Sequence, residues 1–155
     1  MKPKIRDLLD ERSCAHNQTR KTACNAPTPG ATSGGCAFEG AQIALFPYAD
    51  AAHLVHGPIT CLGSSWQTRA TGTSWPGRDL TQVGFTTDIS LNDVVFGGEG
   101  KVAAGIDYIM AHYAPAAVFV YATCVTAMIG DDLDLICRQS AERHGVPVVP
   151  VHAPG

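Results

Sequence analysis

The stretch NDVVFGGEGKVAAGIDYIMAHYAPAAVFVYATC, residues 92–124, decides the predicted fold. A short apolar run at Asp93–Phe96 predicts a strand that leads into two glycines. Apolar residues then recur at helical spacing to about His112, and the second apolar run, Ala116–Tyr121, is typical of a buried strand. A strand, a helix and a strand in this order form a β-α-β unit with parallel strands.

The residues that follow repeat the alternation. A helix is predicted from about Ile129 to His144, with acidic residues in its first turns, Asp131 and Asp132 among them, as the helix dipole favours. Gly145 ends this helix, and Val146–Val151 is the next predicted strand. The whole pattern predicts an α/β fold, a Rossmann-like parallel sheet with helices on both faces.

The amino-terminal third has a different character. Residues 5–12 predict a short charged helix, and residues 17–35 are polar and rich in Pro, Gly, Ser and Thr, which is typical of an irregular arm. We therefore expect an amino-terminal arm over residues 1–35 and an α/β domain over residues 36–155.

The start of this domain predicts two short helices and a long loop. Ala37–Leu45 follows a glycine pair and Cys36, and Ala49–Val55 is a second helix candidate that His56-Gly57-Pro58 would end. Residues 63–79 hold both tryptophans among Ser, Thr, Gly and Arg, which predicts an irregular segment.

Length and composition narrow the class of protein. The 155 residues suffice for one domain with a hydrophobic core. The 14 acidic and 11 basic side chains give a net charge of −3, which argues against a nucleic acid partner. The apolar runs are too short to span a bilayer, and no secretion signal is visible. We expect a soluble cytoplasmic protein, in which the six cysteines serve metal binding or redox chemistry more readily than disulfides.

Three of the cysteines are placed to project from the scaffold. Cys36 opens a predicted helix, where free amides donate hydrogen bonds to sulfur, and Cys61 lies in a predicted tight turn three residues beyond Pro58. Cys124 follows a predicted strand, and open α/β sheets bind ligands at the carboxyl ends of their strands. The spacings of 25 and 63 residues match neither a zinc ribbon nor a ferredoxin, so a joint metal site and three small buried side chains both stay open.

The other cysteines favour simpler interpretations. Cys137 shares a helix face with Leu133, which predicts a core position. Cys14 and Cys24 flank His16 in the polar arm, where solvated thiols or a weak zinc site are the alternatives.

Several other kinds of site are excluded or disfavoured. Residues 97–101 lack the glycine and the hydroxyl residue that a phosphate loop requires, and Gly98-x-Gly100 matches only a loose dinucleotide pattern whose ribose-binding acid is absent. His53 and His56 could share a helix face, where they would orient the turn before Cys61. No arrangement of a catalytic triad is visible.

Four segments together resemble nitrogenase component 1 and its relatives: Gly34-Gly35-Cys36-Ala37-Phe38-Glu39-Gly40-Ala41, His56-Gly57-Pro58-Ile59-Thr60-Cys61, Val95-Phe96-Gly97-Gly98-Glu99 and Tyr121-Ala122-Thr123-Cys124. Within this group, residues 14–17, 31–45 and 130–132 are most similar to the E subunits of the scaffold on which the nitrogenase cofactor is assembled. The resemblance implies the first of three α/β domains.

The resemblance also implies a cofactor and partners. Family members place three cysteines, which match Cys36, Cys61 and Cys124, on a [4Fe–4S] cluster at the interface with a homologous N subunit in a heterotetramer. The nitrogenase iron protein is a further implied partner, and the iron–molybdenum cofactor precursor is bound only by the full-length family chain, beyond residue 155.

Two alternatives remain from the sequence. The same three-cysteine plan occurs in the catalytic α subunit of nitrogenase and in dark-operative tetrapyrrole reductases, so a catalyst stays open although an assembly scaffold is favoured. A small standalone zinc or thiol protein, built on Cys14, His16, Cys24 and Cys36, is the alternative of another class.

Overall fold

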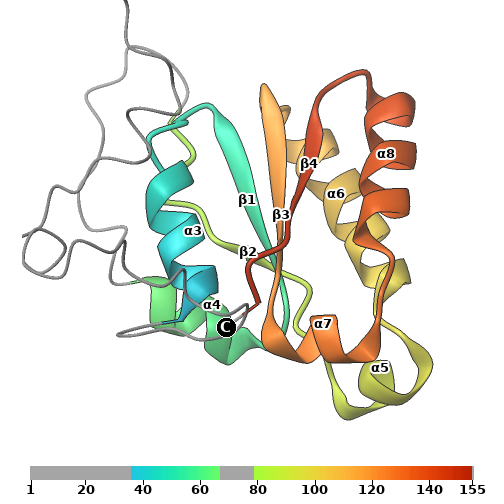
Figure 1. The fold of residues 1–155 in the computed structure, drawn as a ribbon. Helices are drawn as coiled ribbons and strands as arrows, with labels where there is room; N and C mark the ends of the chain where they lie inside the picture. The colour runs from blue at the N-terminus through green and yellow to red at the C-terminus, as the bar shows by residue number, and fades with distance from the viewer. Residues whose placement is uncertain (1–35, 67–78, 155) are drawn as a thin grey trace, which may run out of the picture. The chain divides into compact units, whose positions relative to one another are not determined.

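A four-stranded parallel sheet forms the centre of the structure (Figure 1). This computed structural model describes residues 36–66 and 79–154, which belong to one unit, Thr32–Gly155. The sheet order is β2-β1-β3-β4, and every pair of neighbouring strands is parallel. The strands are β1 Ala51–His56, β2 Phe85–Thr86, β3 Ala117–Ala122 and β4 Val148–Val151.

Helices cover both faces of this sheet, which confirms the predicted α/β fold. Figure 1 shows α3 and α4 on one face, α6 and α8 on the other, and α5 and α7 beyond the ends of the strands. The helices are α3 Ala37–Leu45, α4 Ile59–Trp66, α5 Leu91–Phe96, α6 Glu99–Tyr113, α7 Cys124–Ile129 and α8 Leu133–His144.

The two faces of the sheet bury separate apolar clusters. On the side of α6 and α8, Leu54 and Val120 of the strands pack with side chains such as Ile106 and Ile136. On the side of α3 and α4, the smaller cluster is Phe38, Val55, Leu62 and Tyr121. Since β1 and β3 contribute to both clusters, the central strands are apolar on both faces, as parallel sheets require.

The prediction of a helix over Ala49–Val55 is wrong, because these residues enter the central strand β1. All six residues of β1 are buried, and its register runs from Ala51 opposite Ala117 to His56 opposite Ala122. Alanine favours helices in isolation, but burial between two neighbouring strands overrides that preference.

The prediction of a strand over Asp93–Phe96 is also wrong, because these residues form the helix α5. The backbone N–H of Ser90 donates to the Asp93 carboxylate at 2.7 Å, which is half of a capping box. Val95 and Phe96 are exposed rather than buried in the sheet. The strand that the sequence analysis missed is β2, Phe85–Thr86, which is only two residues long.

The predicted helix from about Ile129 to His144 corresponds to α8 alone, which begins four residues later at Leu133, and the separate helix α7 that ends at Ile129 was not predicted. Gly130 ends α7 with a φ of 83°, and Asp132 caps α8 by accepting a hydrogen bond from the Leu135 N–H at 2.9 Å. Asp131 lies between the two helices and not in a helical turn. The predictions of α3, α6, β3 and β4 are confirmed to within two residues, and Gly145 ends α8 with a φ of 69°.

Some predictions fall on parts of the chain that the structure does not describe. The helix over residues 5–12, the arm over residues 17–35 and most of the irregular segment 63–79 lie outside the described residues, while Gly63–Trp66 belongs to α4. Within residues 36–66 and 79–154, no helix combines the length and the apolar character needed to cross a membrane.

Candidate cluster-binding site

Cys36, Cys61 and Cys124 each lie at the start of a helix. Cys36 is the residue that precedes α3, as predicted, and Cys124 is the first residue of α7, separated from the end of β3 by Thr123 alone. The prediction of a turn at Cys61 is corrected, because this residue lies in the first turn of α4. The turn that the sequence indicated is Gly57-Pro58, and the helix begins immediately behind it.

Cys61 lies close enough to Cys36 and Cys124 to be affected by both. Burial raises the pKa of the Cys61 thiol, and the neighbouring Cys124 and Cys36 raise it further. A repulsive effect of this kind requires proximity, since it decays with distance. Residues that are 25 and 63 positions apart in the chain therefore come together at the same edge of the sheet. Cys36 and Cys124 are exposed, whereas Cys61 is partly buried.

The apolar cluster behind the thiols anchors two of the helices. Phe38 of α3 makes an edge-to-face contact with Tyr121, with ring centroids 5.9 Å apart, and Cys61 packs against the same cluster. The Tyr121 hydroxyl lies 2.7 Å from Nδ1 of His53, so the ring of Tyr121 is held on this face of the sheet. Cys36 therefore precedes a helix that packs on Tyr121, and Cys61 lies against the same apolar cluster.

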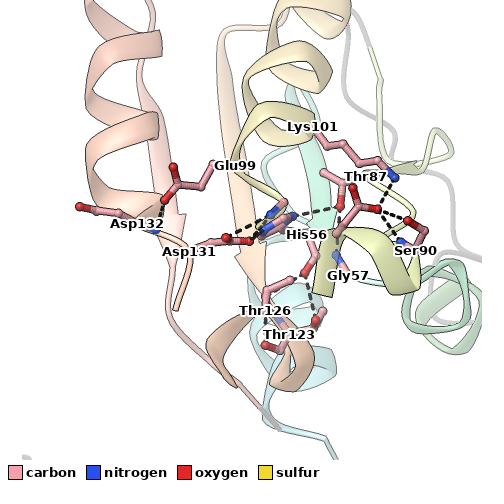
Figure 2. A network of polar contacts seen from close by, with 12 residues as sticks. His56, Gly57, Thr87, Ser90, Glu99, Lys101, Thr123, Thr126, Asp131 and Asp132 are labelled. Atoms are coloured by element: carbon pink, nitrogen blue, oxygen red, sulfur yellow. Dashed lines mark hydrogen bonds and ion pairs between the residues drawn. The ribbon is translucent and has the colours of Figure 1, made fainter. Parts of the chain in front are cut away.

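His56 is the centre of a polar network on the opposite face (Figure 2). Its Nδ1 lies 3.0 Å from the Thr87 hydroxyl and its Nε2 lies 2.8 Å from Oδ2 of Asp131. Both side chains of the His56–Asp131 pair are almost fully buried. Burial lowers the pKa of His56, and the hydrogen bond and charge of Asp131 oppose this shift without reversing it.

The idea that His53 and His56 share a helix face is wrong. Both residues belong to β1, where residues an odd number apart point to opposite faces. His53 accordingly contacts Tyr121, and His56 contacts Thr87 and Asp131.

Asp131 also contacts the glycine pair that precedes α6. Both of its carboxylate oxygens accept from the Gly98 N–H at 3.1 Å. A nucleotide phosphate would bind to backbone N–H groups at a helix start of this kind, and here the Asp131 carboxylate occupies that position. A Cβ on Gly98 would lie 2.9 Å from Cε1 of His56, which explains the glycine. Close packing against His56 is therefore sufficient to explain why residue 98 is glycine.

The remaining cysteines divide into one described residue and two others. Cys137 is fully buried in the core, as predicted, and burial raises its pKa to about 12. Cys14, His16 and Cys24 lie outside the described residues. Sequence analysis missed the contacts of Thr87 and Asp131 with His56, which join residues 31 and 75 positions apart. The Gly130-Asp131-Asp132 helix break was the one local signal for Asp131.

The donor set of the three cysteines is one that iron and zinc both accept, since thiolate binds either metal. Within the described ranges, no three or more His, Cys, Asp or Glu side chains are grouped so as to hold one metal ion. Zinc would require four donors that converge at about 2.0–2.3 Å. An iron–sulfur cluster binds each thiolate through a different iron atom, so its protein ligands lie farther apart.

Similarity to known proteins agrees with the fold. Two relatives are named "Nitrogenase iron-molybdenum cofactor biosynthesis protein NifE": that of Nostoc sp. is 54% identical over 98% of this chain, and that of Klebsiella pneumoniae is 52% identical over 96%. Each alignment covers 32% of the relative, so the chain spans about a third of the length of these curated relatives.

A solved structure and a family model extend the comparison. The structure titled "Nitrogenase Cp1 at pH 6.5" is 34% identical, with a TM-score of 0.76 over 86% of this chain and 27% of its own chain. The model of the family "Nitrogenase component 1 type Oxidoreductase" matches residues 36–155, which include every described element. The chain therefore belongs to the nitrogenase component 1 type oxidoreductase family.

Proposed function

We propose that this chain is a NifE-like subunit of the scaffold on which the iron–molybdenum cofactor of nitrogenase is assembled. In this proposal Cys36, Cys61 and Cys124 supply three thiolate ligands to a [4Fe–4S] cluster that lies at the interface with a homologous N subunit. The relatives that carry the name NifE, at about half identity over nearly the whole chain, support the scaffold assignment.

The single observation that supports the ligand set is the convergence of three free thiols. Each one lies at the start of a different helix, and the thiols of Cys36 and Cys124 both raise the pKa of Cys61. The neighbouring thiols disfavour the thiolate form of Cys61, and positively charged iron would relieve this effect. Because the thiolate is the form that binds iron, metal binding is expected to be coupled to deprotonation of Cys61.

The number of thiols implies a partner. A [4Fe–4S] cluster commonly takes four cysteine ligands, and three from one chain leave one iron for a ligand from another subunit. Cys36 and Cys124 are exposed, as ligands at an interface should be before the partner binds. When bound, the cluster supplies electron transfer or a structural link between the subunits.

The wider proposal follows the family. We place the α/β domain at residues 36–155 behind an arm of residues 1–35, in a cytoplasmic heterotetramer that works with the nitrogenase iron protein. No residue of this chain is assigned to the iron–molybdenum cofactor precursor. A catalytic α subunit of nitrogenase is the alternative, and the named relatives favour the scaffold over it.

The partner dependence can be tested by anaerobic metal analysis. The chain is purified alone and after co-production with a candidate N subunit, and iron and acid-labile sulfide are measured in both samples. We expect about four iron atoms per heterodimer in the co-produced sample and far fewer in the chain alone. Equal iron in both samples, or zinc in place of iron, would contradict the shared cluster.

A further inference from the structure

We propose that Thr123 and Thr126 are positioning residues, whose hydroxyls clamp the main-chain carbonyl of His56 and thereby set the placement of Cys124 relative to Cys61. This inference rests on the proposed function, because it concerns how the chain holds two of the three ligands. It assigns a role to two residues that neither bind iron nor belong to the apolar core.

The clamp consists of two hydroxyl groups on one carbonyl oxygen. The Thr123 hydroxyl donates to the His56 oxygen at 3.0 Å, and the Thr126 hydroxyl lies 3.1 Å from the same oxygen (Figure 2). A carbonyl oxygen has two lone pairs, so it can accept both hydrogen bonds. All three residues are buried, which means that water does not replace these contacts. The His56 carbonyl oxygen therefore accepts hydrogen bonds from two buried hydroxyl groups.

The same hydroxyls also organise the start of α7. The Thr123 N–H donates to the Thr126 hydroxyl oxygen at 3.0 Å, and the Thr123 side chain accepts from the Thr126 N–H in a reciprocal cap. The proton of the Thr126 hydroxyl is shared between the carbonyls of His56 and Thr123, both at 3.1 Å. Cys124 lies between the two capping residues, and the hydroxyls of these residues also bond to the His56 carbonyl at the end of β1.

Close packing of Gly57 completes the clamp. A Cβ on Gly57 would lie 2.5 Å from Oγ1 and 2.7 Å from Cγ2 of Thr123, which is closer than atoms can approach. The Gly57 N–H donates to the Thr87 hydroxyl at 3.2 Å, and the Ile89 N–H donates to the Gly57 oxygen at 3.1 Å. Gly57 is thus held by hydrogen bonds of its N–H and its oxygen, and by its contact with the Thr123 side chain. α4 begins two residues later.

These contacts connect the two ligands by a short path. From Cys124 the path runs through the adjacent Thr123 to the His56 carbonyl, and from there along four intervening residues to Cys61. Pro58 has a fixed φ and stiffens this segment, and the Cys61 N–H donates to the Pro58 oxygen at 3.0 Å. A rigid connection of this kind preorganises a metal site.

Four variants separate a positioning role from a general contribution to stability. Thr126→Val removes the hydroxyl and keeps the shape, and Thr126→Ser keeps the hydroxyl. Thr123→Val tests the second half of the clamp. Thr81→Val is the matched control, because Thr81 is also buried and its hydroxyl donates a hydrogen bond to Asp79. Thr81 lies far from the clamp: the neighbouring Leu80 N–H donates to the oxygen of Ala49, which precedes the opposite end of β1.

The first measurement is hydrogen exchange of the metal-free chain, read by mass spectrometry in Gly57–Trp66 and in α7. We expect Thr126→Val and Thr123→Val to speed exchange in both segments by about fivefold, the effect of one lost buried hydrogen bond. Thr126→Ser and Thr81→Val should leave both segments unchanged. Exchange that rises in α7 alone, or in neither segment, would overturn the clamp.

The second measurement is the electron paramagnetic resonance spectrum and midpoint potential of the reduced cluster in the co-produced complex. We expect altered g values and a shifted potential in Thr126→Val, with the wild-type spectrum restored in Thr126→Ser and unchanged in Thr81→Val. A wild-type spectrum and potential in Thr126→Val would overturn the positioning role. A wild-type complex without iron would refute the cluster, while the exchange data would still decide whether the clamp couples the two helices.

Discussion

Nε2 of His56 lies 2.8 Å from Oδ2 of Asp131, 75 residues further along the chain, and both side chains are buried. This pair joins the end of β1 to the segment between α7 and α8, and it supports the strand end from which the polypeptide enters the helix of Cys61. The account predicts that the fold and the candidate site depend on this pair.

Replacing Asp131 by Ala should destabilise the chain strongly. The substitution leaves the Gly98 N–H and Nε2 of His56 buried without their acceptor, at a cost of roughly 3–5 kcal/mol in the free energy of unfolding. Urea denaturation measures the change. The matched control is Asp134→Ala, whose carboxylate pairs with His152 on the surface and should change stability by at most about 1 kcal/mol. Equal losses in the two variants would contradict the role of Asp131.

The stability of the chain should fall as the pH drops below about 6.5. Burial lowers the pKa of His56 in the folded chain, with Asp131, Asp93 and Glu99 acting in the opposite direction, so the unfolded chain binds the proton more readily. The contribution of His56 is therefore complete above the unfolded pKa and is lost as the pH falls toward the lower folded pKa. Denaturation of the wild type and of His56→Gln between pH 5.5 and 7.5 measures the slope, which should be smaller in the variant. An identical slope in both proteins would show that another group is responsible.

Gly57→Ala should be destabilising, and Thr123→Ala should relieve part of the effect. The new Cβ would overlap with Oγ1 and Cγ2 of Thr123, which we expect to cost about 1–3 kcal/mol. Thr123→Ala removes both atoms, so a double-mutant cycle should give a favourable interaction energy for the pair. Gly40→Ala is the control, because nothing lies within 4 Å of its Cβ and α3 should gain stability. Strict additivity of the Gly57 and Thr123 effects would contradict the contact.

The described thiols should react with an alkylating reagent in a defined order. Cys36 and Cys124 are exposed and should react first, Cys61 more slowly because burial and its two neighbours raise its pKa, and Cys137 only after unfolding because burial raises its pKa to about 12. Peptide mapping of a Cys14→Ser/Cys24→Ser chain gives the four rates. Reaction of Cys137 in the folded chain would contradict its core position.

Sequence analysis predicted the parts of the fold that depend on local patterns. The apolar run of β3, the periodicity of α6 and the stop at Gly145 are local signals, and all three are confirmed. β1 was mistaken for a helix because the burial that makes Ala51–His56 a strand comes from two other strands. α5 was mistaken for a strand because three apolar residues outweighed the capping signal of Ser90 and Asp93.

The same distinction applies to the candidate site. The cysteines stand out in the sequence because glycines, a proline and a strand end mark their positions, and the structure brings them together. The polar network behind them was not predicted, since contacts such as those of His56 with Thr87 and Asp131 join distant segments. Residue spacing carries no information on such pairs before the fold is known.

The ligand identity of the three cysteines is the central claim, and iron content tests it most directly. Cys36→Ala, Cys61→Ala, Cys124→Ala and the control Cys137→Ala are each co-produced anaerobically with the N subunit, and iron per heterodimer is measured together with the spectrum of the reduced cluster. The account predicts that each of the first three substitutions removes most of the iron or converts the cluster, while Cys137→Ala keeps the wild-type iron content and spectrum. Full iron and an unchanged spectrum in any of the first three variants would contradict the proposed ligand set.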